Sequence, residues 1–151
     1  MVKRERVSIM PKLTIVCGLP GAGKTEYARK LGCLLIEPGD NACYIDGEFK
    51  YDRTQSLVGH KHFPKVVRSI MENVGCDIAI VGVFCSMYPV ESYKEIAEDN
   101  DYDVELVEIK TTPELAAKYS TKKVGITDLK GMQQNWVKRK ADKVIDRTKN
   151  D

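Results

Sequence analysis

The amino-acid sequence predicts an α/β domain of three layers, in which helices flank a mostly parallel β-sheet. Two observations support this fold class. Short apolar runs, typical of buried strands, alternate along the chain with segments of helical periodicity, which is the order expected of a parallel sheet with helical connections. The chain of 151 residues also has the length of one domain. Its 42% hydrophobic and 30% charged residues are typical of a globular protein rather than a disordered or membrane-spanning one.

Five segments are expected to form strands because they are short, apolar and rich in β-branched residues. The run at 78–84 is apolar throughout, as in a central strand of a parallel sheet. The turn-forming sequence Pro38–Asn41 closes the second run. The expected strands are Leu13–Cys17, Cys33–Ile36, Ala42–Ile45, Ile78–Phe84 and Val104–Ile109.

Helices are expected between these strands. The segment 63–74 places its apolar residues on one helical face, and Gly75 is a stop signal. Residues 47–62 and 120–125 are polar and are expected to be mostly loop. The expected helices are Lys24–Leu31, Phe63–Val74, Pro89 to about Asn100, one beginning at Thr112 and Pro113, and a last one beginning near Thr127 or Asp128 and running through Trp136 towards Val144.

Charge is unevenly distributed along the chain. The net charge is +2, but residues 1–12 and residues 138–151 each carry +3, which leaves −4 on the body between them. Basic ends can help to hold a polyanion, or they can be solvated termini. The sequence is accordingly divided into a basic N-terminal extension (1–11), a central domain (12–137) and a basic C-terminal helix end or tail (138–151).

Cysteine and histidine usage indicates neither a disulfide framework nor a zinc site. The cysteines are odd in number and form no CxxC pair. Three of them, Cys17, Cys43 and Cys85, lie in apolar runs and are expected to be buried. The two histidines, His60 and His62, are expected on an exposed polar loop.

Nothing in the sequence predicts membrane insertion or export. No apolar run approaches the roughly 18–20 residues of a transmembrane helix, and the first residues lack the apolar stretch of a signal peptide. A cytoplasmic location is therefore expected, and the sequence leaves the oligomeric state open.

The strongest chemical signal is the segment GLPGAGKT at residues 18–25, which fits the phosphate-loop pattern GxxxxGK[ST] and stands between a predicted strand and a predicted helix. Glycines let the backbone wrap an anion, and successive N–H groups with the helix N-terminus then attract phosphate. Lys24 is expected to reach the β- and γ-phosphates of ATP, and the Thr25 hydroxyl to bind Mg²⁺. The residues expected to bind the nucleotide are Gly18, Pro20, Gly21, Ala22, Gly23, Lys24, Thr25 and Glu26.

Around this motif, the chain resembles a family. GLPGAGKTEYARKL, YIDGEF, VESYKEIAEDNDYDVELVEI and PELAAKYSTKKVGITDLKGMQQNW occur in the order found in the small P-loop kinases typified by the kinase domain of bacteriophage polynucleotide kinase. They are also similar to NEDD4-binding-protein-2-like P-loop domains. The resemblance covers about residues 12–137. It implies a P-loop NTPase fold and transfer of the γ-phosphoryl group of ATP, with Mg²⁺, to a hydroxyl, first of all the 5′-hydroxyl of a polynucleotide.

Two other functions remain open from the sequence. One is a kinase for a nucleotide or another small molecule, which the acidic body favours weakly. The other is a nucleotide-binding regulatory protein with little or no turnover.

The resemblance also suggests a catalytic base and a lid. The family places an aspartate after the second strand as the base, and Asp46 in YIDG stands at the matching place, with Glu48 as a substitute. The alternative is a simple Asp-Gly turn. In the lid, Lys118 and Lys122 replace the arginines of the family and stand four residues apart, so that both could face the phosphates from one helix. The alternative is a solvated basic face.

One departure from the family lies at the end of the strand 78–84. Gly82 stands where the family carries a carboxylate or another polar residue, and Ser86 is the nearby hydroxyl. The acceptor site has therefore changed, or strong catalysis has been lost. Phe84 and Tyr88 could stack on a base, or they could be core residues.

Overall fold

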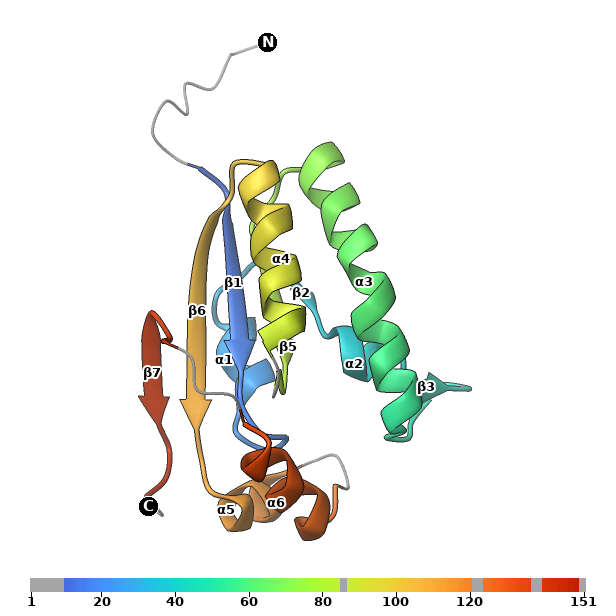
Figure 1. Ribbon diagram of the computed structural model, residues 1–151, viewed down its shortest axis with the longest axis vertical. Helices are drawn as coiled ribbons and strands as arrows, with labels where there is room; N and C mark the ends of the chain where they lie inside the picture. The colour runs from blue at the N-terminus through green and yellow to red at the C-terminus, as the bar shows by residue number, and fades with distance from the viewer. Residues whose placement is uncertain (1–9, 85–86, 121–123, 137–139, 150–151) are drawn as a thin grey trace.

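The computed structural model describes residues 10–84, 87–120, 124–136 and 140–149. Its main sheet has five strands in the order β2-β5-β1-β6-β7, and all neighbouring strands are parallel (Figure 1). This confirms the predicted fold class. The strands are β1 (Lys12–Cys17), β2 (Leu34–Ile36), β5 (Ile78–Gly82), β6 (Asp103–Lys110) and β7 (Lys143–Asp146).

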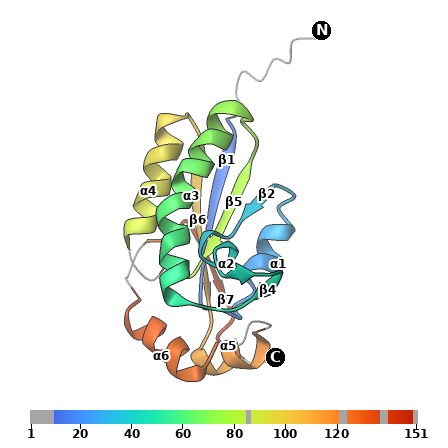
Figure 2. The same ribbon diagram turned by 90° about the vertical axis from the view of Figure 1, so that its right-hand side faces the viewer.

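Helices cover both faces of this sheet. Figure 2 shows α3 (Arg53–Asn73) and α4 (Met87–Asp99) together over one face, with α1 (Lys24–Arg29) on the other side of the strands. Side chains alternate along β1 accordingly. Leu13 and Ile15 pack into the cluster under α3 and α4, whereas Val16 packs with Ala28 of α1. Both clusters are closed to solvent, so the central strand β1 is held rigidly on two sides.

Short elements gather at the carboxyl ends of the strands. The helices α5 (Pro113–Tyr119) and α6 (Ile126–Gln134) lie beyond the tips of β1 and β6 (Figure 1). On the other side, α2 (Pro38–Asn41) follows β2, and a separate hairpin of β3 (Tyr44–Ile45) and β4 (Glu48–Phe49) follows α2. Open α/β sheets bind ligands at this edge.

The prediction that residues 47–62 are mostly loop is wrong. Helix α3 begins at Arg53, and the Asp52 carboxylate caps it by accepting a hydrogen bond of 3.0 Å from the Gln55 N–H. Gly59, which suggested a loop, lies inside the helix, because a β-carbon there would collide with the Pro38 carbonyl of α2. The glycine therefore marks a close approach of two helices rather than a break.

The prediction of a last helix running towards Val144 is also wrong. Helix α6 ends at Gln134, and the segment 143–146 is strand β7, which pairs with β6. Asp142 fixes the start of β7 through two hydrogen bonds to Leu106. Its backbone N–H donates to the Leu106 carbonyl at 2.9 Å, and its carboxylate accepts from the Leu106 N–H at 2.8 Å. The stretch interpreted as a C-terminal helix end or tail thus contributes a strand to the sheet.

None of the described cysteines is part of a disulfide. Cys17 and Cys43 are fully buried, as predicted, and Cys85 lies outside the described residues. Within the part of the chain that the structure describes, no helix combines the length and apolarity needed to cross a bilayer.

Candidate nucleotide site

The phosphate loop lies at the carboxyl end of β1 and leads directly into α1. Gly21 and Gly23 both have φ near +90°, a conformation that other residues rarely adopt. Each is also in close contact with a distant segment. A β-carbon on Gly21 would collide with the Ala116 carbonyl of α5, and one on Gly23 would collide with the guanidinium of Arg147. The loop is therefore enclosed between α5 and the segment that follows β7.

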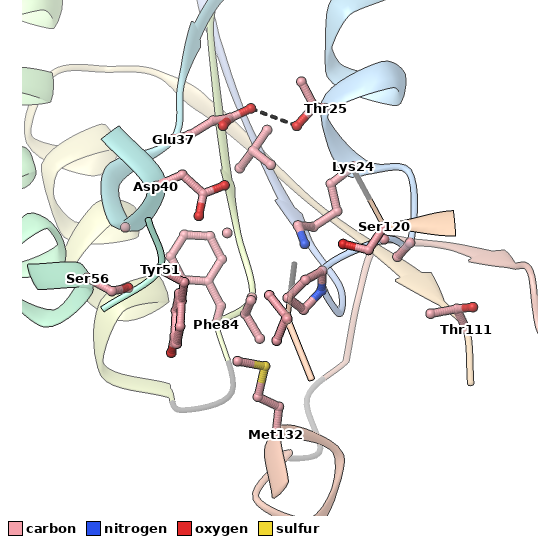
Figure 3. Close-up of a pocket in the computed structure, with 18 of the residues that line it drawn as sticks. Lys24, Thr25, Glu37, Asp40, Tyr51, Ser56, Phe84, Thr111, Ser120 and Met132 are labelled. Carbon is pink, nitrogen blue, oxygen red and sulfur yellow. Dashed lines mark hydrogen bonds between the residues drawn. The ribbon is translucent and has the colours of Figure 1, made fainter. Parts of the chain in front are cut away.

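The side chain of Lys24 lies inside the curve of the loop. Its ammonium donates hydrogen bonds to the carbonyls of Gly18, at 2.7 Å, and Leu19, at 2.9 Å. Figure 3 shows the ammonium facing the cleft. This position suits a cation that meets phosphate oxygens held by the loop.

Thr25 lies opposite two carboxylates that follow β2. Its hydroxyl donates a hydrogen bond of 2.7 Å to Glu37, and Asp40 of α2 projects into the same cleft (Figure 3). Hydroxyl and carboxylate oxygens are the ligands that Mg²⁺ prefers, so these residues fit the ion. Among the described residues, no group of three or more His, Cys, Asp or Glu side chains forms a complete metal cage. A magnesium ion at Thr25 would therefore depend on phosphate oxygens as well.

Glu37 and Asp40 were not recognised from the sequence. Both come within four residues of the end of β2, and carboxylates directly after a buried strand were the available signal. The next apolar run, which ends at Asp46, carries the same signal, and the predicted base was placed there.

Asp46 lies away from the edge of the main sheet. The strand before it, β3, belongs to the separate hairpin, so the expectation that Asp46 follows a strand of the parallel sheet is wrong. Asp46 has φ 51° and Gly47 has φ 80°, which is the conformation of a tight hairpin turn. Its side chain is exposed and does not line the cleft, and Glu48 is exposed as well. The Asp-Gly turn explains this position.

The segment predicted to form a lid begins with helix α5, which is only seven residues long. Helix α5 ends at Tyr119, and Ser120 is already extended. Lys118 is exposed, with its ammonium 5.2 Å from the centre of the Tyr119 ring, while Lys122 lies outside the described residues. The helix contacts the phosphate loop through Ala116, which is buried with Leu19 and Leu129.

Gly82, the position at which the resembled family carries a carboxylate or another polar residue, packs against the aromatic ring of Phe84. A β-carbon on Gly82 would lie 2.9 Å from the ring of Phe84, which is only 3% exposed. Phe84 adopts φ 50° and makes edge contacts with His60 and Tyr93, at centroid distances of 5.3 and 6.3 Å. Phe84 is therefore a core residue that reaches the floor of the cleft. Ser86 lies outside the described residues, as does the side chain of Tyr88.

His60 belongs to α3 and not to an exposed loop. It is half-buried on the wall of the cleft, and burial lowers its pKa below 6.5, an effect that the nearby charge of Asp40 opposes. Its Nδ1 atom is buried without a hydrogen bond among the described residues. His62 is exposed on the same helix.

One continuous cleft of about 1860 Å³ is lined by the phosphate loop, Glu37, Asp40, His60 and Phe84. It extends from the phosphate loop to α3 on one side and to the residues after β7 on the other. Arg147, which the sequence analysis did not single out, lies at that second end, and its guanidinium donates a 2.9 Å hydrogen bond to the Ala22 carbonyl. The cleft has room for a nucleotide and a second molecule.

Comparison with known proteins agrees with this architecture. No known protein family and no curated protein matches the sequence. Solved structures do match. A candidate kinase from Chloroflexus aurantiacus has 13% sequence identity and a TM-score of 0.68, covering 93% of this chain and 90% of that one. The APS kinase of Mycobacterium tuberculosis, in complex with AMPPNP and APS, has 14% identity and a TM-score of 0.62, with 93% and 91% coverage.

A third similar structure is the Pnkp1/Rnl/Hen1 RNA repair complex, with 15% identity and a TM-score of 0.60 over 89% of this chain and 47% of that one. These identities are too low to transfer a substrate. The parallel sheet, the loop after β1 and these neighbours together establish that the chain has the fold of the P-loop kinases.

Proposed function

We propose that the protein is an ATP- and Mg²⁺-dependent kinase that transfers the γ-phosphoryl group to a hydroxyl, in the first place the 5′-hydroxyl of a polynucleotide. The observation that carries this proposal is the single cleft that places the phosphate loop opposite the carboxylate of Asp40 and the wall formed by α3. A phosphate donor, a base and an acceptor can therefore meet in one cleft.

The nucleotide phosphates would be held by the backbone N–H groups of residues 18–26 and by Lys24, with Thr25 and Glu37 beside the magnesium position. The bound ion would neutralise charge on the β- and γ-phosphates. The Thr25–Glu37 hydrogen bond orients the threonine hydroxyl, so this side of the site is ordered by the protein itself.

Asp40 is the base that we propose in place of Asp46. It lies in the cleft, whereas Asp46 is exposed on the hairpin turn. In the transfer step, the acceptor oxygen forms a bond to the γ-phosphorus while the bond to the bridging oxygen breaks. The electron pair leaves with ADP, and the proton of the acceptor hydroxyl passes to the Asp40 carboxylate.

The acceptor side of the cleft favours a molecule with both an anion and a ring. Arg53, Leu57 and Lys61 stand four residues apart on α3 and all line the cleft. Three aromatic residues line it nearby, namely Tyr44, Phe49 and Tyr51. Cations recognise phosphate and aromatic rings stack on bases, so a nucleotide unit fits this wall.

A panel of acceptors tests this proposal. The protein is incubated with γ-labelled ATP and Mg²⁺, together with 5′-hydroxyl oligonucleotides with and without a 3′-phosphate, nucleosides, APS and gluconate. We expect label on the oligonucleotides. Label only on a small molecule would establish a small-molecule kinase, an alternative supported by the similar APS kinase structure that holds APS.

A second candidate function is nucleotide binding with little turnover. The observation that favours it is the Phe84 ring packed on Gly82, which leaves no carboxylate at the end of β5. Tight binding of Mg·ATP with no label on any acceptor in the panel would support this candidate.

A further inference from the structure

The side chain of His60 lies where α3 meets α2 on the wall of the cleft. Its ring lines the cleft and makes an edge contact with Phe84, at a centroid distance of 5.3 Å. A β-carbon on Gly39 would lie 3.0 Å from the Nε2 atom of His60, so this nitrogen lies against the backbone of α2, one residue before Asp40. Helix α3 therefore places an imidazole nitrogen beside the proposed base.

Two glycines make this close approach possible. Gly59 brings α3 against α2, and Gly39 leaves room for the side chains of Ser56 and His60. Asp40 and Ser56 both line this part of the cleft (Figure 3). Asp40 is also within electrostatic reach of the imidazole, because its charge acts to raise the pKa of His60. The packing of the two helices therefore holds the imidazole and the Asp40 carboxylate near each other.

The two nitrogens of His60 have different surroundings. Nδ1 is buried and has no hydrogen-bond partner in the part of the chain that the structure describes, whereas Nε2 is the nitrogen that faces α2. A neutral imidazole has one N–H donor and one acceptor nitrogen. A proton on Nδ1 would be a buried donor without an acceptor, which costs free energy. The favoured neutral ring therefore carries its proton on Nε2, where a partner in the cleft can accept it.

Packing alone does not explain a histidine at this position. Phenylalanine in the same place would keep the ring contact with Phe84 and would remove the unpartnered nitrogen, which lowers stability. Tyr93 offers a comparison, because it also contacts Phe84, at 6.3 Å, and its hydroxyl is also buried without a partner among the described residues. Tyr93 does not line the cleft, whereas His60 does. A polar group that costs stability and faces a cleft points to a ligand in that cleft.

We infer that His60 binds the phosphate acceptor, with its Nε2–H donating a hydrogen bond to an uncharged oxygen of the sugar unit that carries the attacking hydroxyl. This inference rests on the proposed kinase function and names the part of the acceptor that lies beside Asp40. A neutral donor next to a carboxylate suits an uncharged oxygen, because the carboxylate repels a phosphate. The phosphate of the acceptor would lie towards Arg53 and Lys61. The Nε2 proton stays on His60, while the proton of the attacking hydroxyl passes to Asp40.

Steady-state kinetics with a 5′-hydroxyl oligonucleotide and three variants of His60 test the inference. We expect His60→Phe to lower kcat/KM for the acceptor about tenfold, because one hydrogen bond to the acceptor is lost, while the calorimetric affinity for Mg·ATP stays the same. His60→Gln should recover most of the loss, since the glutamine amide nitrogen can reach the place of Nε2. His60→Asn should not recover it, since the shorter side chain ends near the place of Nδ1.

Thermal denaturation separates acceptor binding from packing. His60→Phe should melt at the temperature of the unchanged protein or above it, because carbon replaces a buried nitrogen that has no partner among the described residues. Tyr93→Phe is the matched control. It removes a second buried polar atom of this kind next to Phe84, and it should change neither the acceptor kinetics nor the affinity for Mg·ATP.

The outcomes separate the inference from the function on which it rests. If the unchanged protein labels no hydroxyl in the acceptor panel, the proposed function fails and the inference fails with it. If it labels the oligonucleotide and His60→Phe does so with the same kcat/KM, only the inference is overturned. A larger loss in His60→Gln than in His60→Phe also overturns it, because the aromatic ring and not the nitrogen would then be needed.

A result with a destabilised variant is still decisive. If His60→Phe lowers the melting temperature, the decision passes to the comparison of His60→Gln with His60→Asn. The value of kcat/KM for the acceptor must be higher in His60→Gln, and equal values overturn the inference. A weaker affinity for Mg·ATP in all three variants overturns it as well, because His60 would then act on the nucleotide.

Discussion

The two ends of the cleft are built in different ways. On the donor side, one short stretch of sequence forms the phosphate loop, and the surrounding protein closes over it. On the acceptor side, the wall comes from α2, the β3–β4 hairpin and α3, whose packing depends on contacts such as Gly59 against Pro38. The phosphate loop is thus one short segment against which Ala116 and Arg147 pack, whereas the opposite wall is assembled from three separate elements. Structures of this fold include an APS kinase and a gluconokinase, which is consistent with this division.

The sharpest test of the donor side is Lys24→Ala. We expect transfer to fall below detection and ATP binding to weaken by about tenfold or more, because the ammonium at Gly18 and Leu19 is lost. Calorimetry and the labelled-ATP assay measure the two effects. Lys30→Ala, an exposed lysine just after α1, is the control. Normal turnover in Lys24→Ala would overturn the assignment of the loop.

The second test asks which aspartate is the catalytic base, and it compares Asp40→Asn with Asp46→Asn. We expect Asp40→Asn to reduce turnover by roughly 10²–10⁴-fold at nearly unchanged ATP affinity, because the amide cannot accept the proton. Asp46→Asn should leave turnover unchanged, since the side chain is exposed on a turn that asparagine also tolerates. The reverse ranking would restore Asp46 as the base.

Gly82→Ala tests the packing on the floor of the cleft. The added methyl would meet the Phe84 ring at 2.9 Å, so the free energy of unfolding should fall by about 1–3 kcal/mol. Gly131→Ala is the matched control, because the β-carbon at this position of α6 meets no atom within 4 Å, and it should stabilise the protein by up to about 1 kcal/mol. Chemical denaturation measures both. Equal stability of the two variants would mean that the Phe84 ring moves aside freely.

On the acceptor wall, we expect the double change Arg53→Ala with Lys61→Ala to raise KM for a 3′-phosphorylated acceptor about tenfold while KM for ATP stays the same. The loss of two exposed cations weakens phosphate recognition on this wall of the cleft. Initial-rate kinetics with each substrate varied in turn separate the effects. An equal rise for both substrates would place these cations at the donor side instead.

The smallest expected effect is a pH dependence of stability at His60. Burial lowers its pKa in the folded protein, so the unfolded chain, with an ordinary histidine pKa of 6.5, binds the proton first. The free energy of unfolding should therefore decrease as the pH falls through about 6.5. His60→Gln should flatten this slope, and the exposed His62→Gln should not. Melting temperatures between pH 5 and pH 8 provide the measurement.

The contrast between the two sides also explains what the sequence could predict. The fold class, the central strands and the phosphate loop could be predicted from local patterns. An apolar run determines a buried strand, and a glycine motif determines the loop that follows it. Asp46 was misplaced because the strand before it pairs in a hairpin, and only tertiary structure distinguishes that pairing from a place in the main sheet. Arg147 gave no local signal at all, since its contact with Ala22 depends on β7 lying next to β6.

The contact between Arg147 and Ala22 has a consequence for the order in which the protein assembles. The phosphate loop is made early in synthesis, whereas two of its neighbours, Ala116 and Arg147, are made late. Contacts between distant parts of a chain form slowly, because a long loop must close first. The nascent chain therefore carries a phosphate loop without these two contacts until α5 and β7 have docked.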